Sequence, residues 1–388
     1  MKIVKNAAAA CEQWKTLLEA LDEDVSQEDA TRFFEVVSTE LADWQVEQVV
    51  APETVHRRQE AVLAVHWHPE FVPMPLIERR IAAMFPNMRD SLIIPTQHNE
   101  LTGLGDYAGV EVDCYSHGFN RKVQLLLHFT RDRLEKADTL RLILSHTYKY
   151  RSSQLFAFLE ALTKPDRDCL EPAVRETGAD EDVVAFTRTH ASKIEQLLDM
   201  YWDQVPGMSL KNKLLRNWFD ALRSTAGDAA IDRVQAFLTA VKRRVKATFP
   251  LNYFYRASEV IEEARSLGAG IVIPHPEQFW PILLANYDVD GIEVWNPQSL
   301  EYTEFLISVV GEKNRAARTH DRPILVFMGD DCHMGEKTRP RSQRDAAKAG
   351  REIGYQPAWD DLSIRKKLIV EGVSRSSVIR QYKERLAG

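Results

Sequence analysis

The histidines and carboxylates of this sequence include two pairs whose spacing suits metal binding. His66 and His68 stand two residues apart in Val65-His-Trp-His-Pro, at the end of an apolar run that is typical of a strand. Side chains at positions i and i+2 of a strand point to the same face, so both imidazoles can reach one ion. Asp331 and His333 repeat this spacing in Asp-Cys-His. We infer that each pair supplies metal ligands.

Four further candidate ligands lie on or just after predicted strands. His98 lies in Thr-Gln-His-Asn, Glu111 in Gly-Val-Glu-Val, His128 at the end of Leu-Leu-Leu-His, and His275 in Pro-His-Pro. Six of the eleven histidines thus follow predicted strands. Imidazole and carboxylate ligands together suit zinc, manganese or iron, and the set is larger than one tetrahedral ion needs. The sequence therefore predicts two or three divalent ions, an inference that depends on the set rather than on any single histidine.

The elements that must position these side chains are short strands that alternate with turns and helices. Apolar, β-branched runs predict strands at 61–65, 92–96, 109–113, 123–127, 271–274, 291–295 and 324–328. In a βα barrel, the carboxyl ends of parallel strands meet on one rim, where distant ligands can converge. We therefore predict an α/β fold with a distorted, TIM-like βα barrel.

Helical segments interrupt and extend the predicted barrel. Apolar residues at helical spacing predict an N-terminal helical extension over 1–58 and a large all-helical insertion over 131–254. The barrel then consists of a first part, 59–130, and a second part, 255–388, which ends in a helical tail.

Composition excludes some classes of protein and leaves others open. The net charge of −7 over 388 residues argues against a surface built throughout to hold nucleic acid. The cysteines form no CxxC pair, as expected where thiols stay reduced; they are Cys11, Cys114, Cys169 and Cys332. The sequence has no apolar run of membrane-spanning length and no signal peptide at its beginning, so we expect a cytoplasmic protein.

In their order and flanking residues, these motifs resemble those of the PHP family, named for polymerase and histidinol phosphatase. The matching segments are HWH, TQHN, GVEV, the lone His128, IPHP, GIEVWN and MGDDCH. The resemblance covers about 61–130 and 255–336, and it implies a PHP-type barrel that holds a phosphoesterase centre of two or three metal ions. Carried over position by position, the implied metal ligands are His66, His68, His98, Glu111, His128, His275, Asp331 and His333.

Two departures from the family pattern favour two ions over three. Gln97 stands where the family has an aspartate, and neither histidine nor aspartate closely follows His-Trp-His. The implied reaction is attack on phosphorus by a hydroxide that the ions share. His275 or His333 is expected to protonate the leaving alkoxide, and Asp331 is counted with them as a catalytic residue.

The substrate is predicted less sharply than the metal centre. A small phosphorylated metabolite or a nucleotide is favoured over polymeric nucleic acid because the chain is acidic. Arg121 and Arg339 are candidates for binding the substrate phosphate, although such charges are more often merely solvated. Glu293 in GIEVWN is a candidate for orienting a ligand histidine, with a purely structural role as the alternative. Two alternatives stay open: an amidohydrolase that cleaves a C–N bond with a bridging modified lysine, and a non-catalytic metal-binding regulatory protein.

Overall fold

The computed structural model describes residues 13–164, 167–317 and 322–388, and it divides the chain into two compact units. The first, here called the helical unit, comprises 1–40 and 149–250. The second, here called the sheet unit, comprises 41–148 and 251–388 and contains every predicted metal ligand. No helix among the described residues is long and apolar enough to cross a membrane.

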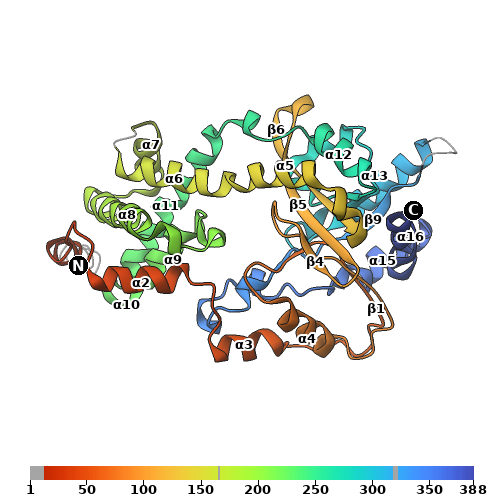
Figure 1. Ribbon diagram of the computed structural model, residues 1–388, viewed down its shortest axis with the longest axis horizontal. Coiled ribbons are helices and arrows are strands. Elements are labelled where there is room, and N and C mark those ends of the chain that lie inside the picture. The colour runs from red at the N-terminus through yellow and green to blue at the C-terminus, as the bar shows by residue number, and fades with distance from the viewer. Residues whose placement is uncertain (1–12, 165–166, 318–321) are drawn as a thin grey trace. The chain divides into compact units, whose positions relative to one another are not determined.

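The strands of the sheet unit form three sheets (Figure 1). A six-stranded sheet has the order β4 (Thr102–Leu104), β5 (Tyr107–Ser116), β6 (Arg121–Thr130), β7 (Gly270–Ile273), β8 (Gly291–Trp295) and β9 (Leu325–Met328). Two parallel pairs complete the set: β1 (Ala61–Ala64) with β3 (Asp90–Ile93), and β2 (Trp67–His68) with β10 (Cys332–His333). Backbone hydrogen bonds link segments of these sheets: the Thr96 amide, just after β3, donates to the Trp67 carbonyl of β2, and the Asp331 amide to the His66 carbonyl, both at 2.8 Å.

The mixed α/β class is confirmed, whereas a TIM-like barrel of parallel strands is not shown. Each predicted strand overlaps an observed one. However, β4–β5, β5–β6 and β6–β7 pair antiparallel. The reason lies in the connection between β5 and β6, which is the short turn η1 (His117–Phe119) with Asn120 at φ +50°. A turn this short can join only antiparallel strands, because parallel strands need a crossover of a dozen or more residues.

Helices of the sheet unit pack on these strands around two buried hydrophobic clusters. They are α3 (Asp43–Val50), α4 (Met74–Met84), α5 (Asp138–Tyr148), α12 (Ala257–Ser266), α13 (Thr303–Ala316), α14 (Ala346–Ala349), α15 (Leu362–Val370) and α16 (Arg375–Ala387). The C-terminal helix α16 contacts β1, β3, β6 and β9 and buries Tyr382 and Leu386 among them. The tail of the chain is thus part of the sheet unit's core.

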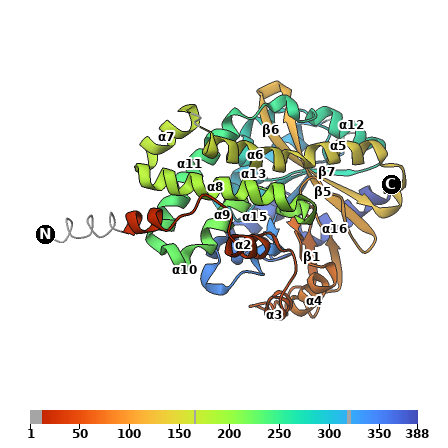
Figure 2. The same ribbon diagram turned by 60° about the vertical axis from the view of Figure 1, so that its left-hand side comes forward.

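The helical unit has a separate hydrophobic core. Its helices are α2 (Gln27–Val37), α6 (Tyr150–Thr163), α7 (Arg167–Thr177), α8 (Glu181–Tyr201), α9 (Lys213–Ala221), α10 (Arg223–Ala226) and α11 (Asp228–Thr248). Helices α6, α8 and α11 contact one another and lie side by side in Figure 2. The expected apolar stripes face inward, as shown by the complete burial of Trp218 and Phe219. Ser26 starts α2 by a capping box with Asp29.

Two predicted domain boundaries differ from the observed units. The expected insertion over 131–254 is shorter, because α5 places Leu140 and Leu144 in the core of the sheet unit. The expected N-terminal extension over 1–58 is split at residue 40, and α3 belongs to the sheet unit. Cys11 lies outside the described residues, and the other three cysteines are buried.

Candidate metal centre

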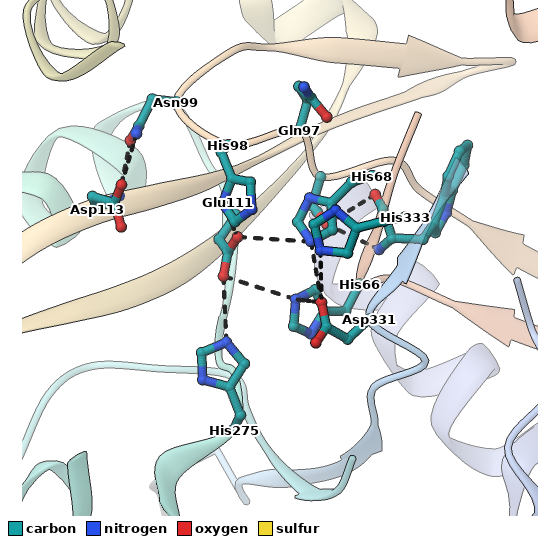
Figure 3. Close-up of polar contacts among 12 residues, drawn as sticks. His66, His68, Gln97, His98, Asn99, Glu111, Asp113, His275, Asp331 and His333 are labelled. Carbon is teal, nitrogen blue, oxygen red and sulfur yellow. Dashed lines mark hydrogen bonds and ion pairs between the residues drawn. The ribbon is translucent and has the colours of Figure 1, made fainter. Parts of the chain in front are cut away.

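Strand ends bring seven of the eight predicted ligands together in the sheet unit (Figure 3). Parallel pairing of β2 with β10 sets His68 opposite His333, and their rings stack 4.2 Å apart. An isolated bridge sets His98 beside Glu111 of β5. His66 lies between β1 and β2, and His275 and Asp331 follow β7 and β9. His275 and Asp331 both have positive φ, +27° and +44°, which turns the chain sharply at these points.

Glu111 lies at the middle of the cluster and faces four imidazoles. Its Oε1 is 3.4 Å from His275 Nε2 and 3.8 Å from His66 Nε2. Its Oε2 is 3.8 Å from His68 Nε2 and also contacts His98 Nδ1. The two oxygens of this carboxylate therefore face different pairs of histidines.

Asp331 faces the same cluster from the other side. Its Oδ1 lies 3.4 Å from both His68 Nε2 and His333 Nε2, and 3.7 Å from His66 Nε2. Its Oδ2 points away and accepts hydrogen bonds from two other side chains. One oxygen of Asp331 is thus turned toward the histidines.

Several of these buried atoms have no hydrogen-bond partner. They are His66 Nε2, His68 Nδ1 and Nε2, His275 Nδ1 and both carboxylate oxygens of Glu111. Burying such groups unsatisfied is costly, and bound cations are the usual compensation for a cluster of this kind. Ligand atoms of two trios, His68–His98–His333 and His66–His68–Glu111, lie within 4.8 Å of one another. The side chains present therefore fit divalent metal ions bound by nitrogen and oxygen.

The electrostatics of the cluster are those of closely coupled acids and bases. Burial raises the pKa of the Glu111 carboxyl, but the closely facing imidazoles of His98 and His275 outweigh this and leave the pKa well below its usual value. Burial lowers the pKa of His66, but the Glu293 carboxylate outweighs this and raises it to about 10. For His68, burial and the neighbouring His98 and His333 leave the pKa well below its usual value. Ionised carboxylates among imidazoles make a site where cations can replace protons.

Glu293 orients two of the candidate ligands at once. Its Oε1 accepts a hydrogen bond from His66 Nδ1 at 2.7 Å, which leaves His66 Nε2 facing the cluster. Its Oε2 accepts one from the His275 backbone amide at 3.0 Å. Gly329 makes room for the carboxylate, because a Cβ there would lie 2.3 Å from Glu293 Oε1. A carboxylate behind a ligand histidine fixes the tautomer and the ring orientation.

Glu70 is a carboxylate of the site that the sequence analysis did not single out. Its Oε1 lies 3.6 Å from His333 Nδ1, and its backbone has a positive φ of +52°. Its amide donates to Gln97 Oε1 at 3.3 Å, so Gln97 connects two of the ligand-bearing segments. Its position four residues after His66 could have indicated this role, but only a histidine or an aspartate was expected as a further ligand there.

His128 does not join the cluster, which corrects the predicted ligand set. Its Nδ1 is hydrogen-bonded to the Tyr382 hydroxyl at 2.7 Å and its Nε2 to the Val65 carbonyl at 2.9 Å. Both ring nitrogens therefore have partners, and burial lowers the pKa of this histidine to about 4. The ring is a structural link between β6, the segment after β1, and α16.

The two arginines predicted to bind substrate lie in different surroundings. Arg121 is exposed at the start of β6 and pairs with Ser116, five residues beyond Glu111 on β5. At about 3.3 Å per residue, this separates it from Glu111 by roughly 16 Å along the strand. Arg339 Nε lies 3.5 Å from Glu336 Oε2. A role for either arginine in substrate binding stays a prediction.

Comparisons with known proteins do not identify the chain. No model of a known protein family matches it, and no curated protein matches it either. Among solved structures it is similar to a protein from Bifidobacterium adolescentis that is proposed to be a metal-dependent phosphoesterase. The TM-score is 0.37 and the identity 15%, over 82% of this chain and 98% of that one.

Proposed function

We propose that this protein is a metal-dependent hydrolase of the PHP type that cleaves a phosphoester. The observation that carries the proposal is the set of buried imidazole nitrogens and Glu111 oxygens that face one another without hydrogen-bond partners. The ordered sequence motifs, from His-Trp-His to Asp-Cys-His, support the choice of phosphoester chemistry.

The residues divide into two groups that share Glu111. Its Oε1 faces His66 and His275, and its Oε2 faces His68 and His98, so either oxygen would help to hold a divalent ion together with the histidines that it faces. Asp331 would add a ligand on the side of His68, and His333 lies beside it. When bound, divalent ions would supply Lewis acidity, which lowers the pKa of a water molecule to about 7 and offsets charge on phosphoryl oxygens.

A proton donor to the leaving alkoxide is expected within the same cluster. His333 is better placed for this role than His275, because its side chain is 27% exposed whereas that of His275 is 5% exposed. A leaving group must depart toward solvent, and an imidazole at that boundary can reach it. Asp331 holds His333 from one side, with Glu70 on the other.

The amidohydrolase alternative is disfavoured by the surroundings of Lys337. This lysine follows the last ligand motif, and its Nζ donates to the Ala349 and Arg351 carbonyls and to the Glu352 carboxylate, at 2.6–2.7 Å. A lysine held in this way is not positioned to bridge two ions. We therefore favour phosphoester cleavage, and the net charge of −7 favours a small phosphorylated metabolite or a nucleotide over polymeric nucleic acid.

The proposal is tested by metal reconstitution and turnover. Chelator-treated protein is reconstituted with Mn²⁺, Zn²⁺ or Fe²⁺ and assayed on p-nitrophenyl phosphate, bis(p-nitrophenyl) phosphate and a p-nitroanilide. We expect metal-dependent release of p-nitrophenol, no cleavage of the anilide, and loss of both bound metal and activity in Glu111→Gln. Glu100→Gln, an exposed residue close by in sequence, is the matched control.

Other outcomes would assign the protein to a different class. Cleavage of the anilide alone would favour an amidohydrolase. Stoichiometric metal with no turnover on a broad phosphoester panel would favour a metal-binding regulatory protein.

A further inference from the structure

A buried guanidinium lies on the outer oxygen of Asp331. Arg351 Nη1 donates to Asp331 Oδ2 at 2.6 Å and to the Asp331 carbonyl at 3.1 Å. Gln298 Nε2 donates to the same Oδ2 at 2.7 Å. The Arg351 side chain is only 7% exposed, so this charged pair is shielded from solvent.

The segment that carries Arg351 is itself fixed by buried polar contacts. Its neighbour Glu352 accepts bonds from Arg80 at 2.5 and 2.9 Å and from Lys337 at 2.7 Å. The Arg351 carbonyl accepts bonds from Lys337 Nζ at 2.7 Å and from Cys332 Sγ at 3.3 Å. The guanidinium therefore approaches Asp331 from a rigid support.

We propose that Arg351, assisted by Gln298, is a positioning residue that makes Asp331 a one-oxygen ligand of the metal centre. This inference rests on the metal site of the proposed function. Hydrogen bonds from both donors occupy Oδ2, which leaves Oδ1 to face His66, His68 and His333. Charge-assisted bonds of this kind fix geometry as well as charge.

The backbone of Asp331 gives a second reason for such a support. Its φ of +44° is a conformation that residues other than glycine adopt at a cost. The bond from Arg351 to the Asp331 carbonyl and the bond from the Asp331 amide to the His66 carbonyl hold this turn in place. Without Arg351, the carboxylate is free to rotate or to offer both oxygens to an ion.

Positioning and charge predict opposite changes in metal affinity. Removing a positive charge beside a cation site strengthens cation binding by Coulomb's law. Releasing an oriented ligand weakens it, typically by about 10–100-fold for partners that hold metal ligands. The sign of the change in affinity therefore decides between the two roles.

The experiment titrates metal-free protein with Co²⁺ and records affinity and the visible d–d spectrum, neither of which requires turnover. We expect Arg351→Met to lower Co²⁺ affinity by about 10–100-fold and to weaken the d–d bands as the coordination number rises. Arg351→Lys should restore most of the affinity, because an ammonium can still hold Oδ2. The matched control is Arg265→Met, which removes an arginine–aspartate pair at 2.6 Å to Asp290, outside the ligand set.

Equal or tighter Co²⁺ binding by Arg351→Met would overturn the proposal. If that variant does not fold, Gln298→Met removes the second donor to Oδ2 and must show a smaller loss in the same direction. If the wild-type protein binds Co²⁺ and the variants change its affinity as expected, but no phosphoester is hydrolysed, the proposed function is refuted and the role of Arg351 stands. Wild-type protein that binds no Co²⁺ would refute both.

Discussion

Glu293 shows how much one buried carboxylate can organise at the scale of single residues. Its two oxygens hold the His66 ring and the His275 backbone, which come from different strand ends. The side chain itself is fully buried. Both ligands therefore depend on the space that Gly329 leaves for this carboxylate.

We expect Gly329→Ala to disturb the centre without unfolding the chain. The new methyl group would lie 2.3 Å from Glu293 Oε1, closer than carbon and oxygen can approach, so the carboxylate must move away from His66. Metal affinity should fall by about 10–100-fold, measured by Co²⁺ titration. Gly350→Ala is the control, because its methyl group would meet the nearest atom, the Ala346 carbonyl, at 3.4 Å. Unchanged affinity in Gly329→Ala would mean that the carboxylate does not orient the ligands.

Strand alternation made the paired ligands predictable, and other residues had no comparable signal. In the structure His66 lies beside His68 and Asp331 beside His333, as the two-residue spacing predicted, although the positive φ of Asp331 departs from regular strand geometry. The same reasoning failed for His128. The two-residue period predicts which face of the strand a side chain lies on, but not which residue packs against that face, and here it is Tyr382 of the C-terminal helix. Arg351 was not foreseen for the same reason, since its partner is known only once the chain has folded.

At the scale of elements, the hairpin of β5 and β6 positions Glu111 by letting another segment come close. The Glu111 amide donates to the Gln97 carbonyl at 3.1 Å, which brings His98 alongside. Gly109 allows this approach, because a Cβ there would lie 2.6 Å from the Pro95 carbonyl oxygen.

Gly109→Ala should therefore push the segment 94–98 away from β5. We expect a loss of about 1–3 kcal/mol in the free energy of unfolding, as for other overpacked sites, together with weaker metal binding as His98 leaves Glu111. Urea denaturation and Co²⁺ titration measure the two effects. In Gly118→Ala, on the turn after β5, the added methyl group has nothing within 4 Å and both quantities should stay at wild-type values. Wild-type stability in Gly109→Ala would contradict the close approach.

Periodicity identified these elements but not their partners. The strands at 109–113 and 123–127 were expected, but their antiparallel pairing was not, because an apolar run carries no direction. Helix α5 was expected as a helix but grouped with the insertion. Its apolar stripe shows that one face is buried and does not show in which core.

At the scale of the whole molecule, two units with separate cores should respond to different conditions. The candidate metal ligands all belong to the sheet unit, so bound metal should stabilise that unit. The helical unit carries a buried titratable group of its own, His190 in α8, whose Nδ1 accepts a bond from the Trp218 indole at 3.3 Å. Burial, followed by the charge of Lys193, lowers the pKa of His190 to about 3.

Acid should therefore weaken the helical unit through His190. In the unfolded chain this histidine titrates at its ordinary pKa of 6.5, so below that pH the unfolded state binds a proton that the folded state refuses. The stabilisation is complete above pH 6.5 and decreases by about 1.4 kcal/mol per pH unit as the pH falls toward 3.

Hydrogen exchange of α8 and α9 between pH 6.5 and 4.5, in the wild-type protein and in His190→Gln, measures this loss of stability. The glutamine still accepts the indole bond but does not titrate, and subtracting its slope cancels other groups such as Glu195, whose pKa burial raises. Equal slopes for the two proteins would show that His190 is protonated without unfolding the unit.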